Sequence, residues 1–216
     1  RLKTEQEKLK TLQYLKVLNG EKISGAPVID DKPAYLEWAT WRALLAINDL
    51  VCKAYESRRF PVDHDFYPRF TAPGGGSDLV IEYKEFVLIV EVTLTTSSRQ
   101  MSAESEPVRR HTAEYVKQFA GKEVICLFIA PNIDNNVLHF FRDAIWYDNE
   151  GKECRVDIVP INLPTVIKIF EHIYRKELKR TDLYFLLKSC LSYRDALKTP
   201  QWSEHIKESI AQWMST

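Results

Sequence analysis

The chain lacks several features that mark metal-binding, secreted and membrane proteins. Its 216 residues include only 4 cysteines, none in a CxxC pair, so a zinc ribbon or a thiol redox motif is not expected. We expect reduced, mostly buried thiols instead. No run of about 18 apolar residues and no signal peptide occurs, so the sequence predicts neither a membrane span nor secretion. A cytoplasmic protein is the expectation.

The chain also lacks an excess of charge of either sign. Lys and Arg total 30, and Asp and Glu total 30, so the formal net charge is zero. Dedicated nucleic-acid-binding domains are usually basic, so bulk charge does not favour strong DNA binding by this chain alone. The length suits one α/β domain with a helical appendage. Because the chain begins with Arg1, we expect it to be part of a larger protein.

Helical and strand-like patterns alternate along the chain, which predicts an α/β fold with a mixed sheet and helices on both faces. Helices are predicted at residues 1–18, 34–57, 105–119, 135–147, 166–179, 182–197 and 202–214. Strands are predicted at residues 78–83, 86–94, 124–130 and 155–162. The last helices predict a helical C-terminal region.

Two acidic residues occupy a predicted hairpin where ordinary packing disfavours them. Glu91 interrupts a run of β-branched and aromatic residues typical of a central strand, and a charge there is costly without a partner. If the hairpin turns at Lys84-Glu85, Asp78 lies opposite Glu91, with Cβ atoms roughly 5 Å apart. Two carboxylates that close either share a proton or hold a cation. The hairpin therefore predicts a cation site.

Three further residues could belong to this site, and each has a plainer explanation. Glu37, near the start of the second helix, either favours the helix dipole or lies near the metal. Glu104 stands at the entrance of the helix that carries His111. Two helical turns, about 10.5 Å, separate them, which argues against both binding one ion. The sequence slightly favours a place for His111 on the helix surface beside Arg109 and Arg110.

Two motifs that look functional are not taken as sites. Asp63-His64-Asp65 resembles a zinc cluster, but neighbouring side chains in a loop seldom converge on one ion. Gly74-Gly75-Gly76 is not a phosphate-binding loop, because the lysine and the strand-to-helix order are absent. We expect these glycines to let the backbone approach something closely just before Asp78.

The acidic pair favours a metal-dependent nuclease. Mg²⁺ held by Asp78, Glu91 and the carbonyl oxygen of Val92 would polarise a phosphate and lower the pKa of an attacking water. Mn²⁺ is an expected substitute. A nuclease of this plan usually has lysine two residues after the glutamate. Here that residue is Thr93, so the charge must come from elsewhere or be absent.

With these residues the sequence resembles a known group, the AlwI-like type IIS restriction and nicking endonucleases of the PD-(D/E)XK superfamily. The resemblance is close over residues 35–119. The matching residues are Tyr35-Leu36-Glu37-Trp38, residues 77–83 and 90–95, Glu104, and Arg110-His111 ahead of Glu114-Tyr115. Ser77 and Thr93 depart from the superfamily pattern, which has proline and lysine there, and the AlwI-like group tolerates both departures.

The resemblance implies a restriction-endonuclease-like fold and assigns metal binding or catalysis to Glu37, Asp78, Glu91 and Glu104, with His111 in a supporting role. It further implies a Mg²⁺-dependent site-specific deoxyribonuclease that cuts double-stranded DNA outside the recognised sequence.

The resemblance also implies an organisation and partners. Residues 1–24 would be a helix and linker from a missing DNA-recognition part, residues 25–163 the nuclease core, and residues 164–216 a helical region packed on it. One active site cuts one strand, so a double-strand break needs a self-dimer or a second nuclease subunit. No membrane is implicated.

Two alternatives remain open at this point. The chain could be a non-catalytic module of the same fold that serves protein association, which Thr93 keeps in contention. It could also be a repair or recombination nuclease that acts on branched DNA.

Overall fold

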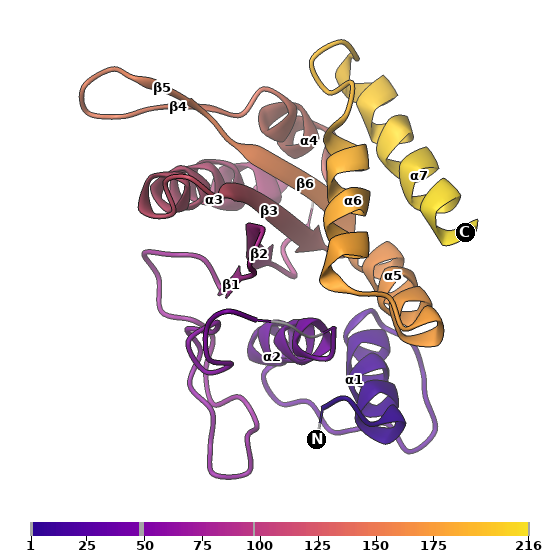
Figure 1. Ribbon diagram of the computed structural model, residues 1–216. Coiled ribbons are helices and arrows are strands. Elements are labelled where there is room, and N and C mark those ends of the chain that lie inside the picture. Colours follow the sequence, from indigo (N-terminus) through magenta and orange to yellow (C-terminus); the bar gives the residue numbers. More distant parts are fainter. Residues whose placement is uncertain (1, 48–49, 97, 216) are drawn as a thin grey trace.

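The structure, a computed structural model, describes residues 2–47, 50–96 and 98–215. In this part of the chain, helices lie on both faces of a central β-sheet (Figure 1). The predicted α/β fold with a mixed sheet is confirmed. Within the same ranges, no helix is long and apolar enough to cross a membrane.

Among the described residues, the central sheet has four strands in the order β1-β2-β3-β6. β1 (Leu79–Glu82) is antiparallel to β2 (Phe86–Val92). β3 (Glu123–Ala130) is parallel to β2, and β6 (Asp157–Asn162) is parallel to β3. The central strands are almost wholly apolar because both of their faces are covered, as parallel sheets require.

Alternate residues of β2 pack into two different hydrophobic clusters. Phe86, Leu88 and Val90 face one cluster, to which α1 (Glu5–Leu18) and α2 (Lys32–Leu45) contribute. Val87 and Ile89 face the other. The side-chain period of two therefore places Glu91 on the same face as Val87 and Ile89.

The helices divide between these two clusters. The first cluster also takes residues of the C-terminal helices, which are α5 (Leu163–Lys176), α6 (Arg180–Leu191) and α7 (Thr199–Ser215). The second cluster lies under α3 (Ser98–Gln118) and α4 (Asn135–Arg142). The side of the sheet that carries Glu91 is thus covered by α3.

Several helix ends differ from the predicted ones. The helix predicted at residues 34–57 ends at Leu45, and by Val51 the chain has reached β1, where its N–H donates to the Glu82 carbonyl at 2.9 Å. The helix predicted at residues 135–147 ends at Arg142. It gives way to β4 (Ile145–Tyr147). Apolar spacing alone did not reveal these stops.

The helix predicted to begin at residue 105 begins at Ser98 and carries Pro107 inside it rather than in its first turn. The buried side chain of Gln100 holds the extra turns in place. Its amide donates to the carbonyls of Thr95 and Asn132 at 2.9 and 3.0 Å and accepts the N–H of Asp134 at 2.9 Å. Hydrogen bonds of this kind cannot be predicted from the spacing of hydrophobic residues.

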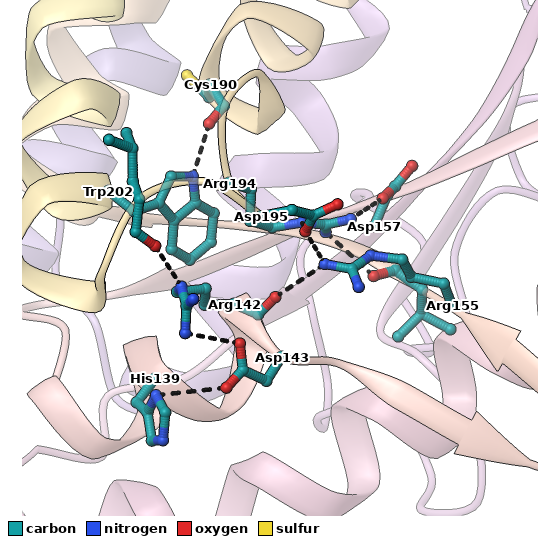
Figure 2. A network of polar contacts seen from close by, with 11 residues as sticks. His139, Arg142, Asp143, Arg155, Asp157, Cys190, Arg194, Asp195 and Trp202 are labelled. Atoms are coloured by element: carbon teal, nitrogen blue, oxygen red, sulfur yellow. Dashed lines mark hydrogen bonds and ion pairs between the residues drawn. The ribbon is translucent and has the colours of Figure 1, made fainter.

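β4 and β5 (Glu153–Arg155) form a separate two-stranded hairpin that extends away from the sheet (Figure 1). A polar network next to it attaches the C-terminal helices (Figure 2). Arg194 donates to Asp157 of β6 at 2.7 Å, and Trp202 Nε1 donates to the Cys190 carbonyl at 2.9 Å. The division into residues 1–24, 25–163 and 164–216 stays a prediction.

Candidate active site

The hairpin of β1 and β2 has the predicted register. Tyr83 N–H donates to the Phe86 carbonyl at 2.9 Å across the turn at Lys84-Glu85. Leu79 lies opposite Val90, and the same register continued by one residue sets Asp78 opposite Glu91. Directly opposed residues point to the same face of a sheet. The prediction that these two acids face each other is confirmed.

The carboxyl group of Asp78 has more carboxylates near it than hydrogen-bond donors. Its Oδ2 accepts the backbone N–H of Val92 at 2.8 Å. Burial raises the pKa of this carboxyl well above its usual range, and the nearby charges of Glu91, Glu37 and Glu104 raise it further. Without a cation, the site therefore favours the protonated form of Asp78.

Glu91 is joined to α3 through His111. His111 Nδ1 lies 2.9 Å from Glu91 Oε1, and these residues are 7% and 9% exposed. In the tautomer that carries its proton on Nδ1, His111 donates to the Glu91 carboxylate, since an ionised carboxylate only accepts hydrogen bonds. His111 Nε2 is buried and has no hydrogen-bond partner within the described part of the chain. The expectation of a surface position for His111 was wrong, because α3 lies flat on the sheet with this residue inward.

Glu37 reaches the site from α2. It is 5% exposed, and its Oε2 accepts the backbone N–H of Ala72 at 2.7 Å. Burial raises its pKa to about 7, with Asp31 and Glu91 acting in the same direction, while the Ala72 N–H and Arg59 lower it. Since Glu37 lies beyond the first turn of α2, the helix-dipole explanation does not account for it.

Glu104 lies inside α3, on the side that faces the end of β2. Burial raises the pKa of its carboxyl, as does the charge of Glu91, while hydrogen bonds with the side chains of Thr93 and Thr95 lower it. The hydroxyl groups of Thr93 and Thr95 are themselves 2.9 Å apart. Thr93, at the position expected to carry a lysine, therefore contacts one of the acids instead.

The predicted distance between Glu104 and His111 is explained by the course of α3. His111 contacts Glu91. Glu104 contacts Thr93 and Thr95, which follow Glu91 by two and four residues. The helix therefore runs antiparallel to this stretch, and its two turns match the advance of the extended chain. The two residues do not share one partner, yet both border one site.

The donor set fits a divalent ion of the Mg²⁺ type. Asp78 and Glu91 supply opposed carboxylate oxygens, and the carbonyl oxygen of Val92 adjoins them on β2. Within the described ranges, no group of three or more His, Cys, Asp and Glu side chains lies close enough to hold an ion. Mg²⁺ commonly takes only one or two carboxylates and completes its shell with waters and substrate phosphates.

A cleft of about 560 Å³ opens beside Glu37 and the end of β2. Glu37 borders it on one side, and the chain from Val92 to Thr96 borders it on the other, with Arg99 at its margin. The cleft therefore gives an extended polyanion access to Glu37 and to the chain that follows Glu91.

Asp63-His64-Asp65 forms a turn that Asp63 stabilises. Asp63 Oδ1 accepts the backbone N–H groups of Asp65 and Tyr67, both at 2.9 Å. His64 is exposed to solvent and pairs with Asp65, at 3.2 Å. The Asp63 carboxylate thus caps a loop.

Two residues near the acids were given no role from the sequence: Arg59, which no motif included, and Tyr115, which was named only among the residues of the resemblance. Tyr115 hydrogen-bonds with the backbone of Ser77, and the charges of Arg59 and Glu91 both act on its hydroxyl. Helical spacing could have revealed Tyr115, because it lies one turn after His111. No pattern could have revealed Arg59, since residues 57–59 do not read as a strand.

Comparisons with known proteins give a consistent result. The model of the AlwI restriction endonuclease family matches residues 2–169. The crystal structure of the small subunit (R.BspD6I2) of the heterodimeric restriction endonuclease R.BspD6I is similar, with a TM-score of 0.74 and 20% identity. This match covers 94% of the present chain and 98% of that subunit, and it supports the restriction-endonuclease-like fold. No curated protein sequence matches the chain.

Proposed function

Because the chain belongs to the AlwI restriction endonuclease family, we propose that it is a Mg²⁺-dependent endonuclease that hydrolyses phosphodiester bonds of double-stranded DNA. Family membership supports a nuclease of the type II restriction class. The observation that carries the finer proposal is the opposition of Asp78 and Glu91 on one face of the sheet. Their mutual repulsion is relieved when a cation lies between them.

In this proposal Asp78, Glu91 and the carbonyl of Val92 bind the ion, for which Mn²⁺ can substitute. An ion held there would polarise the scissile phosphate and would lower the pKa of the attacking water. His111 fixes the orientation of the Glu91 carboxylate through the 2.9 Å contact of its Nδ1. Ligands held by such contacts keep the geometry that an incoming ion requires.

The two remaining acids, Glu37 and Glu104, have other roles in this proposal. Glu37, with a pKa of about 7, can hold or release a proton near neutral pH, as a general acid or base must. Glu104 is oriented by Thr93 and Thr95 at the far end of the site. Both carboxyl groups border the ion-binding pair, so they influence the same phosphate.

We further propose that the chain acts with partners. One active site cuts one strand, so a double-strand break requires a second active site, and the similar crystal structure is one subunit of a heterodimer. A second nuclease subunit or a second copy of this chain would supply it. A DNA-recognition part of the parent protein would supply sequence reading, with cleavage outside the recognised site, in keeping with the zero net charge of this chain.

Nicking of supercoiled plasmid tests the proposal. The full-length protein with Mg²⁺ is expected to produce nicked circles, and Asp78→Ala or Glu91→Ala should abolish them. Glu82→Ala is a matched control, because Glu82 lies on the same hairpin but pairs with Lys122 at 2.6 Å, outside the site. If Asp78→Ala and Glu91→Ala both nick the plasmid as fast as the unsubstituted protein, the proposed nuclease site is wrong.

A non-catalytic module of the same fold is the second candidate, and Thr93 in place of a lysine favours it. Calorimetry with Mn²⁺ separates the two. Saturable binding that Asp78→Ala removes supports the nuclease. Absence of any saturable binding, together with absence of nicking, supports the module.

A further inference from the structure

A short extended segment before β1 lies along that strand. Val80 N–H donates to the Ser57 carbonyl at 3.0 Å, and Arg59 N–H donates to the Asp78 carbonyl at 3.4 Å. Arg58 forms an antiparallel bridge with Leu79 between these two bonds. In that register Arg59 lies directly opposite Asp78.

This register creates a row of three charged residues. Asp78 faces Glu91 on one side and Arg59 on the other, in neighbouring extended segments. Opposed residues share a face and have Cβ atoms about 5 Å apart. Arg59 therefore projects toward the same side of the sheet as the two acids, the side that α3 covers.

The surroundings of the Arg59 guanidinium agree with this position. Its Nη2 donates to the Gly74 carbonyl at 3.3 Å, and its charge acts on the Tyr115 hydroxyl of α3 and on the carboxyl of Glu37. A Cβ atom added at Gly76 would lie 2.5 Å from Arg59 Nη1. The glycine before Ser77 thus leaves room for the guanidinium.

The other amino group of Arg59 lacks an acceptor. Nη1 is buried and has no hydrogen-bond partner among the residues that the structure describes. A buried donor left unpaired is costly, and a cationic one more so. Phosphate oxygens suit a guanidinium especially well, because the planar donor fork can bind two of them at once. The unpaired Nη1 therefore points to an anionic ligand with oxygen acceptors.

We propose that Arg59 binds the scissile phosphate of DNA and supplies the positive charge that Thr93 cannot supply. This inference rests on the proposed nuclease function. The guanidinium stays protonated throughout, so Arg59 contributes charge and orientation and transfers no proton. Thr93 is then free to orient Glu104, with which its side chain hydrogen-bonds.

Arg99 is the rival source of this charge. It borders the cleft that Glu37 and Thr93 also border. Its side chain is exposed, whereas that of Arg59 is held by Gly74 and lies in the row of acids. The two arginines come from different elements, so single variants tell them apart.

The test compares Arg59→Ala with Arg99→Ala in the full-length protein, using supercoiled plasmid with Mg²⁺ under single-turnover conditions. Loss of a preorganised phosphate contact is expected to slow cleavage by about 100-fold or more in Arg59→Ala. Arg99→Ala should slow cleavage far less than Arg59→Ala does. Added guanidinium chloride at low concentration should partly restore Arg59→Ala, which a merely structural defect would not allow.

Two readouts do not depend on cleavage. Arg59→Ala should bind Mn²⁺ at least as tightly as the unsubstituted chain, because a cation beside the acids has been removed, while Asp78→Ala should lose binding. Gly76→Ala should displace the guanidinium and slow cleavage without touching any acid. This second variant keeps the test decisive if Arg59→Ala unfolds, as monitored by circular dichroism.

The outcomes separate the two proposals. Cleavage that needs Asp78 and Glu91 but survives Arg59→Ala and Gly76→Ala within about threefold overturns the role of Arg59 and leaves the nuclease standing. The same holds if only Arg99→Ala slows cleavage. Cleavage that survives Asp78→Ala and Glu91→Ala overturns the nuclease itself.

Discussion

His111 of α3 and Glu91 of β2 meet at 2.9 Å, twenty residues apart in the chain and nearly sealed from water. The contact fixes the rotation of α3 over the sheet, because only one face of the helix can present His111 to the strand. It also leaves the Oε1 atom of Glu91 with a donor before any ion arrives. Several expectations follow from this arrangement and from the neighbouring charges.

Replacing His111 should weaken the site more than the fold. Loss of a contact that orients a metal ligand typically lowers metal affinity or activity by about 10- to 100-fold. We expect His111→Ala to show such a loss in Mn²⁺ calorimetry. His172→Ala is the control, since His172 of α5 is 3% exposed but contacts Trp213 and Arg175 rather than the acids of the site. Equal losses in both variants would contradict the assigned role.

Glu37 should make stability depend on pH. Its carboxyl has a pKa of about 7 in the folded chain against an ordinary 4.5, so the folded state binds this proton more tightly than the unfolded state. The stabilisation is fully present below pH 4.5 and is lost as pH rises through 7. Its upper limit is about 3 kcal/mol.

Urea denaturation without divalent ions, repeated across this pH interval, measures the effect. Glu37→Gln keeps the shape of the side chain and removes the ionisation, so its stability should change less with pH. Parallel curves for the two chains would mean that the proton resides elsewhere.

Divalent ions should stabilise the folded chain through Asp78 and Glu91. An ion present at 100 times its dissociation constant adds about 2.7 kcal/mol, provided that the unfolded chain does not bind it. Thermal unfolding with and without Mg²⁺ or Mn²⁺ should reveal the shift. Asp78→Asn should abolish the shift, whereas Glu82→Gln should retain it, and an unchanged shift in Asp78→Asn would place the ion elsewhere.

The polar network of the C-terminal region should contribute unequally to stability (Figure 2). Arg194 and Asp157 pair at 2.7 Å with side chains that are 7% and 28% exposed. Arg194→Ala therefore leaves the partly buried carboxylate of Asp157 without this partner. We expect a cost of about 3 kcal/mol. Arg155→Ala removes a pair with the exposed Asp195 and should cost less than about 1 kcal/mol. Urea denaturation measures the free energy of unfolding of both variants. A similar loss of stability in the two would show that the burial of the ion pair does not determine its contribution.

The acidic hairpin could be predicted from sequence because its information is local. A two-residue turn at Lys84-Glu85 fixes the register, and the register alone opposes Asp78 to Glu91. The central strand at residues 124–130 was equally accessible, since β3 is apolar on both faces. In these segments, local pattern and tertiary packing specify the same structure.

The features that could not be predicted from the sequence depend on contacts between distant segments. The inward position of His111 depends on how α3 lies over β2, which helical spacing does not encode. Arg59 reaches its place only because the chain leaves α2 at Leu45 and returns along β1. The early start of α3 rests on the buried amide of Gln100, a polar contact that hydrophobic patterns cannot reveal.

The local character of the β1–β2 hairpin has a consequence for the order of assembly during folding. Contacts between residues close in sequence form before those that close long loops. Asp78 and Glu91 thus come together before α2 delivers Glu37 and α3 delivers His111. Their repulsion opposes closure of the hairpin while no partner is yet in place, so protonation of either acid should speed folding itself.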